Sequence, residues 1–188
     1  MHALVASLFW LMLSTWFGAV LLSAIVPPIV LRVTREADPT LPRVLSVNLD
    51  AQHSTLLASM IVGELLSVLF KLQAVCATVL LPALVGQWFF VDRSGVALML
   101  PIMVSGLYVG AVLCLVYGWR VVLPKVLRHR ATYIEHADDP DVANAELDRF
   151  DRYSNELFSV VRNLLFALLG MILFSANFLP TAASLLPK

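Results

Sequence analysis

The sequence predicts an all-α integral membrane protein whose four spanning helices form one bundle. Hydrophobic residues make up 60% of the 188 residues and charged residues only 14%, a balance outside that of soluble globular chains. Almost all charges fall in three places, 32–50, 92–93 and 120–162. Between them, apolar residues occupy every side of a helix for about 20 residues at a time, the length that crosses a hydrocarbon core. We expect one transmembrane domain covering 1–188.

The first span is predicted over residues 3–31. Its apolar run reaches Leu31 without a charge, and no basic segment precedes it. It is therefore interpreted as a retained span and not as a cleaved signal peptide. The pair Pro27-Pro28 predicts a kink or an exit from the membrane, because proline removes a backbone donor and crowds the preceding turn.

The second span is predicted over 72–91, after a polar connector at 32–52. In between, residues 53–70 carry apolar side chains at helical spacing, interrupted by Ser59, Glu64 and Ser67. This pattern predicts an amphipathic helix at the membrane interface that runs without a break into the second span.

The third span is predicted over 96–119 and the fourth over 163–179. Only residues 92–95 connect the second and third spans, and short connections join antiparallel neighbours, so we expect these two to pack as a hairpin. Polar residues fill 120–162 before the fourth span. Asp139-Pro140 offers an N-cap followed by proline at the first helical position, which predicts a cytoplasmic helix that continues into the membrane.

The orientation follows from the basic residues. The segments 32–52 and 120–152 hold nine of them, whereas Arg93 and Lys188 lie on the opposite side. Because basic loops stay in the cytoplasm, we expect both long polar segments to be cytoplasmic and both termini exterior. The expected location is a bacterial inner membrane.

Small residues recur every fourth position along the third span, at Gly106, Gly110, Cys114 and Gly118. Small side chains let two helix backbones approach closely in lipid. The ridge therefore predicts either packing within the bundle or docking to another subunit. The chain's other cysteine, Cys76, also lies in an apolar stretch and is interpreted as a small buried side chain.

Three ionisable residues, Glu64, Lys71 and Arg162, border apolar segments and form a candidate intramembrane charge site. Glu64 and Lys71 are two helical turns apart and cannot pair tightly. A Glu64–Arg162 ion pair across helices is the favoured interpretation. Solvation at the membrane interface and a solute or proton site are the alternatives.

No catalytic or metal-binding motif stands out: the sequence has no cysteine pair, phosphate-cradling glycine loop, zinc-protease motif or nucleophile elbow. His2 and His53 are expected near opposite ends of different spans. His129 and His136 fall among acidic residues without a recognised ligand spacing, so a solvated turn is expected there. Net charge is zero, which gives no electrostatic footprint for nucleic acid. We expect no enzyme activity and no cofactor.

Four groups of residues resemble the transmembrane protein 205-like family, a domain of unknown function with four spans. They are Trp16-Phe17-Gly18 with Pro27-Pro28, Val62-Gly63-Glu64 with Leu69-Phe70, Leu123-Pro124, and Phe150 and Tyr153 followed by Asn163. Ser154 stands where that family commonly has a histidine, so no role of the histidine carries over. The resemblance implies a four-span bundle and no activity.

Taken together, these features predict a non-catalytic accessory or scaffolding subunit of a larger membrane assembly. Its expected partners are membrane lipid and either other membrane subunits or a second copy. A small transporter or channel that uses the intramembrane charges is the alternative, and a haem- or quinone-linked redox protein is the second alternative. A transporter needs a polar path to the midplane, and a redox protein needs an inward-facing histidine.

Overall fold

The computed structural model describes residues 2–37, 53–88, 96–135 and 140–183, and every residue in these ranges is helical. The helices are α1 (His2–Ala37), α2 (His53–Trp88), α3 (Val96–Tyr117), α4 (Leu123–Glu135) and α5 (Pro140–Ala183), with a π-helical turn η1 (Gly118–Val122) between α3 and α4. The predicted all-α fold class is confirmed.

Four of the described segments are long and apolar enough to cross a membrane: Val5–Val30, Met60–Gly86, Pro101–Tyr133 and Ala145–Ala176. The predicted polytopic membrane protein is confirmed. Two details of the prediction also hold: α2 runs unbroken from His53 to Trp88, and α5 begins at Pro140 and enters the membrane without a break.

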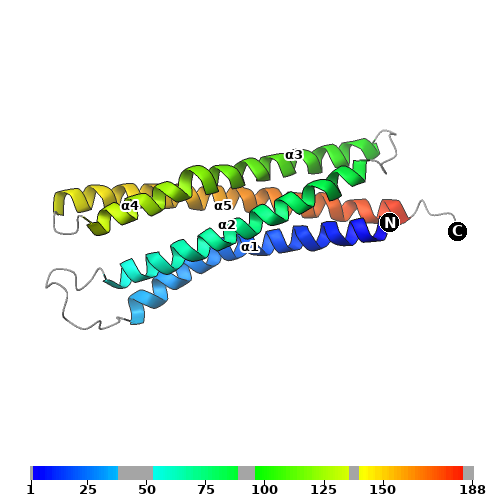
Figure 1. The fold of residues 1–188 in the computed structure, drawn as a ribbon. Coiled ribbons are helices and arrows are strands. Elements are labelled where there is room, and N and C mark those ends of the chain that lie inside the picture. The colour runs from blue at the N-terminus through cyan, green and yellow to red at the C-terminus, as the bar shows by residue number, and fades with distance from the viewer. Residues whose placement is uncertain (1, 38–52, 89–95, 136–139, 184–188) are drawn as a thin grey trace.

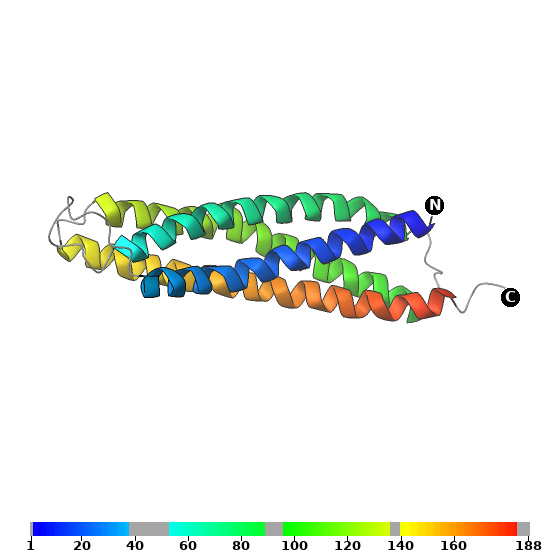
Figure 2. The ribbon, with the colours of Figure 1, turned by 90° about the horizontal axis from the view of Figure 1, so that it is seen from below.

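The helices lie side by side along one long axis and alternate in direction (Figures 1 and 2). α4 continues the line of α3, so α3 and α4 together run antiparallel to α5. The end of α1, the start of α2, the end of α4 and the start of α5 all lie at one end of the bundle. We call this the polar end. The start of α1 and the end of α5 are at the other end.

The expected hairpin of the second and third spans is confirmed in part, since α2 and α3 are antiparallel and two side-chain hydrogen bonds join them. The most extensive contacts join α1 to α2 and α3 to α5, whereas α2 and α3 touch over a small area. A short connection brings two helix ends together, but it does not decide which faces of the helices pack.

Of the kink or exit predicted at Pro27-Pro28, the structure shows a kink without a helix end, because α1 continues to Ala37. The two prolines remove the donors that would reach the carbonyl oxygens of Ser23 and Ala24. Figure 1 shows the light-blue end of α1 turning away from the line of its first half, as expected of a proline kink.

The helical segment α4 was not expected from the sequence. At the junction, the Leu123 N–H donates to the Gly118 carbonyl, one residue further back than in an α-helix. Pro124 has no N–H for the Arg120 carbonyl, and its ring crowds that position. The wider π turn accommodates the proline and lets the helix continue.

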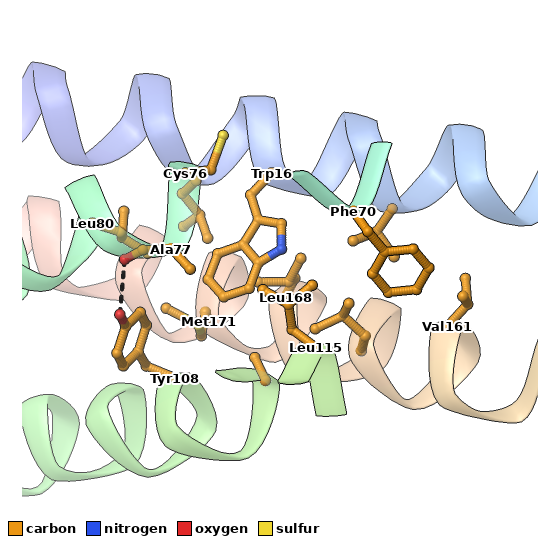
Figure 3. Close-up of a cluster of buried hydrophobic side chains, with 14 of the residues drawn as sticks. Trp16, Phe70, Cys76, Ala77, Leu80, Tyr108, Leu115, Val161, Leu168 and Met171 are labelled. Carbon is orange, nitrogen blue, oxygen red and sulfur yellow. Dashed lines mark hydrogen bonds between the residues drawn. The ribbon is translucent and has the colours of Figure 1, made fainter. Parts of the chain in front are cut away.

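Large side chains from all four spans form a single core. Trp16, Phe70, Leu80, Leu168 and Met171 are almost completely buried. Figure 3 shows these side chains filling the space between the helices. Because large side chains fill the middle of the bundle, the candidate sites lie on its outer faces and at its polar end.

Candidate functional site

The candidate charge site does not assemble. Glu64, Lys71 and Arg162 are all exposed, and no ion pair joins any two of them in the described structure. A Cβ built on Gly118 would lie 3.2 Å from Phe70 and 3.0 Å from Val160. Phe70 and Val160 therefore lie at the same level along the bundle axis.

From that level, Glu64 lies six residues toward the polar end on α2, and Arg162 lies two residues the other way on α5. Eight residues of helical rise separate them by roughly 12 Å along the axis. The predicted Glu64–Arg162 pair is therefore wrong. Lys71 and Arg162 instead share a level, and both are exposed. Solvation at the membrane interface and a solute or proton site stay predictions.

The small-residue ridge of α3 divides into two parts. Gly118 is buried, and a Cβ there would lie 3.0 Å from the Val160 Cγ1 atom. A Cβ on Gly106 or Gly110 would meet no atom within 4 Å, and Cys114 is half-buried. Only the Gly118 end packs closely inside the described bundle.

Two other glycines make close contacts that the sequence analysis did not predict. A Cβ on Gly63 would lie 2.8 Å from the Arg130 guanidinium and 2.9 Å from Leu127, and one on Gly170 would lie 3.0 Å from Leu107. Ser59, Gly63 and Ser67 form a small-residue series at every fourth position, a signal that indicates close helix packing, whereas Gly170 belongs to no such series.

A small buried polar group links α1 to α2. The Gln73 side-chain amide donates to the Ser23 hydroxyl at 3.1 Å, and that hydroxyl donates to the Ala19 carbonyl at 2.8 Å. Both side chains are buried. Polar contacts of this kind help to fix how two spans sit against each other.

A second buried hydrogen bond links α2 to α3. The Tyr108 hydroxyl donates to the Ala77 carbonyl at 2.8 Å, as Figure 3 shows. The Tyr108 ring meets the Trp16 indole edge-on, with ring centroids 6.1 Å apart. This hydrogen bond helps to fix α3 against α2. Cys76, a free and buried thiol, lies nearby on α2.

At the polar end, α4 is tied to α5 by a charged cluster. The His129 Nδ1 atom lies 2.6 Å from a carboxylate oxygen of Glu146, and Arg149 donates to the other oxygen at 2.5 Å. The His129 ring also stacks on Tyr153, with centroids 5.1 Å apart, and the Lys125 ammonium lies 5.0 Å from the same Tyr153 ring. The solvated turn expected around His129 is wrong, since its side chain is half-buried between two helices.

The side chains of the other three histidines are not among those that the structure describes. His136, Asp138 and Asp139 lie outside the described residues, and the side chains of His2 and His53 are not described. Within the described ranges, no group of three or more His, Cys, Asp or Glu side chains is placed to hold a metal ion.

A cleft of about 410 Å³ lies at the polar end, between α1, α2, α4 and α5. Most of its wall is apolar. The apolar lining residues are Pro27, Val62, Leu66, Leu123, Val126, Leu127, Phe150, Leu157, Phe158 and Val161.

Polar groups occupy the rest of the cleft wall. Arg130 comes from α4, Asp151, Ser154 and Asn155 come from α5, and Ser23 comes from α1. Arg130 is half-buried, and its guanidinium lies against Gly63, where any side chain would collide with it. The cleft thus combines an apolar wall with one cation and one anion. Patterns of hydrophobicity along the sequence do not reveal it, because its lining comes from four separate segments.

No family model, curated protein or solved structure matches this chain. The resemblance to the transmembrane protein 205-like family therefore stays a prediction.

Proposed function

We propose that this protein is a non-catalytic accessory or scaffolding subunit that meets another membrane subunit through the outer face of α3. One observation carries the proposal: Gly106 and Gly110 lie on this helix with no atom within 4 Å of the Cβ position. Glycine lowers helix stability by about 1 kcal/mol relative to alanine. It gains nothing against lipid, but it lets a second backbone come close.

The surroundings of the two glycines support a partner inside the membrane. Met103, Val109 and Leu113 on the same helix are exposed, at 49%, 54% and 65%. Apolar side chains beside a glycine surface are typical of packed transmembrane helices. The flexible side chain of Met103 can also adapt to the shape of a neighbour.

The two alternative functions find less support among the described residues. A transporter needs polar groups facing inward, yet Glu64, Lys71 and Arg162 face outward and the middle of the bundle is filled by large apolar side chains. A haem- or quinone-linked redox protein needs a histidine in the spanning core. His129 instead lies at the polar end, held by Glu146.

We also propose that the polar end faces the cytoplasm of a bacterial inner membrane. The support is the distribution of basic residues. Nine belong to the segments 32–52 and 120–152, whose described parts include the end of α1, the whole of α4 and the start of α5. Arg93 lies between α2 and α3 in the sequence, and Lys188 follows α5.

The docking proposal is tested by Gly110→Leu in the full chain. We expect the variant to fold, because its side chain enters open space, and to lose its partner when purified in mild detergent. Ala176→Leu is the matched control, since it adds a leucine to an exposed position of α5. Native mass spectrometry identifies the partner and distinguishes another subunit from a second copy.

Two results would contradict the proposal. One is a wild-type protein that purifies as a bare monomer from its native membrane. The other is a Gly110→Leu variant that keeps its partner as well as Ala176→Leu does.

A further inference from the structure

The cleft at the polar end lies where the hydrocarbon core gives way to lipid headgroups. The first, third and fourth apolar segments reach the polar end at Val30, Tyr133 and Ala145. Pro27, Arg130 and Asp151 lie within about two helical turns of these three residues, and all of them line the cleft. The cleft therefore straddles the boundary between acyl chains and headgroups.

The two kinds of lining match the two parts of a phospholipid. Leu66, Leu157 and Val161 offer an apolar wall on the side of the core, while Arg130 and Asp151 lie further toward the polar end. A volume of about 410 Å³ falls in the range of small-molecule sites, about 300–1,000 Å³. It accommodates part of a lipid, not a second helix.

Arg130 is built into the cleft wall. Its guanidinium lies 2.8 Å from the Cβ position of Gly63, so the absence of a side chain at Gly63 makes room for it. The planar guanidinium of arginine suits phosphate, to which it can donate two parallel hydrogen bonds. Asp151 supplies a carboxylate on the facing helix α5, which suits a primary ammonium group.

We propose that the cleft binds a zwitterionic phospholipid of the phosphatidylethanolamine type from the adjoining leaflet. The phosphodiester lies at Arg130, the ammonium group lies toward Asp151, and the upper part of an acyl chain lies against the apolar wall. The protein is then a lipid-binding membrane protein as well as a candidate scaffold, and this second property does not depend on the α3 surface.

The headgroup contact is tested by native mass spectrometry of the full chain in mild detergent, titrated with palmitoyl-oleoyl phosphatidylethanolamine. We expect one bound lipid on the wild type. Arg130→Gln should weaken binding by about tenfold or more, the effect of losing roughly one charge-assisted contact. Arg128→Gln is the matched control, because Arg128 is an exposed arginine of the same helix that does not line the cleft.

The acyl-chain contact is tested without changing Arg130. Ser154→Trp places a large side chain in the cleft and should abolish the lipid adduct while the melting temperature is maintained. Ser159→Trp is its control, since Ser159 is exposed on α5 and lies outside the cleft. A lipid adduct of wild-type strength on Ser154→Trp would overturn the proposal.

Two further titrations identify the ligand. Palmitoyl-oleoyl phosphatidylglycerol should bind less tightly than phosphatidylethanolamine, because its headgroup has no cation for Asp151. Equal or tighter binding would overturn the headgroup assignment. Inorganic phosphate at millimolar concentration should leave the lipid bound. Displacement by phosphate alone would overturn the lipid assignment and identify a simple anion site.

Discussion

Gly118 offers a sharp test of the packing, because three helices meet at this residue. A Cβ placed on it would lie 3.0 Å from the Val160 Cγ1 atom and 3.2 Å from the Phe70 ring. Ordinary carbon–carbon contacts are about 3.5–4.0 Å. Even alanine must therefore displace a neighbour, and leucine adds three more carbons to the same buried space.

Overpacking of this kind costs about 1–3 kcal/mol. Phe70 is 0% exposed and Val160 8% exposed, so neither has open space into which to move. Gly118→Leu also gains helix propensity, which offsets part of the loss. Gly110→Leu makes the same chemical change at an open position of the same helix. The difference between the two variants removes the propensity effect and measures the packing alone.

The assay is equilibrium unfolding in mixed detergent micelles, followed by circular dichroism. We expect Gly118→Leu to be less stable than Gly110→Leu by about 1–3 kcal/mol, a factor of roughly 5–150 in the unfolding equilibrium. The comparison must use the isolated chain, so that a lost partner does not count as lost stability. A difference below about 0.5 kcal/mol would show that the three helices do not meet at Gly118 as described.

Three other predictions concern a hydrogen bond, the exposed charges and the orientation. Tyr108→Phe removes the hydroxyl that donates to an α2 carbonyl and should lower the unfolding free energy by about 0.5–1.5 kcal/mol; an unchanged value would mean that this bond does not stabilise the α2–α3 contact. Glu64→Gln and Arg162→Gln should have effects on the unfolding free energy that add within about 0.5 kcal/mol in the double variant. A larger coupling energy would show that the two side chains do interact. In intact cells, an impermeant thiol reagent should label a cysteine introduced at Ser184 and not one introduced at Ala137, and the reverse pattern would refute the proposed orientation.

The sequence alone determined the elements of the fold. Apolar runs of about 20 residues have few other uses in a folded chain, so the existence of four spanning helices could be predicted directly. Local signals were equally dependable for the unbroken helix α2 and for the start of α5 at Pro140. These features depend on residues close together in the chain, and periodicity and capping describe such residues well.

Local signals misled where tertiary contacts decide the outcome. Pro27-Pro28 allowed an exit as well as a kink, and Pro124 follows the predicted end of the third span, yet α1 and the α3–α4 segment continue past these prolines. Backbone groups buried in a bilayer gain most from staying helical, because lipid offers them no other partners. A kink and a π turn accommodate the prolines at less cost than an unwound chain.

The candidate site depended most on the tertiary structure. The spacing of Gly106, Gly110 and Gly118 gave all three the same expected role, but only Gly118 meets large side chains from two other helices. The sequence likewise grouped Glu64 with Arg162, whereas the relative shift of α2 and α5 separates them. Helical periodicity places residues on a face of their own helix, and it carries no information on which helix that face meets.

For the cleft too, the sequence determined one part and the packing of the helices decided the other. The sequence determined that apolar helices end in basic polar segments, and it predicted the spans over 3–31, 72–91, 96–119 and 163–179. Only the packing of α1, α2, α4 and α5 brought Ser23, Gly63, Arg130 and Asp151 around one cavity. These residues are far apart in the chain, and their proximity follows from helix pairings that are fixed by side-chain fit along whole helices.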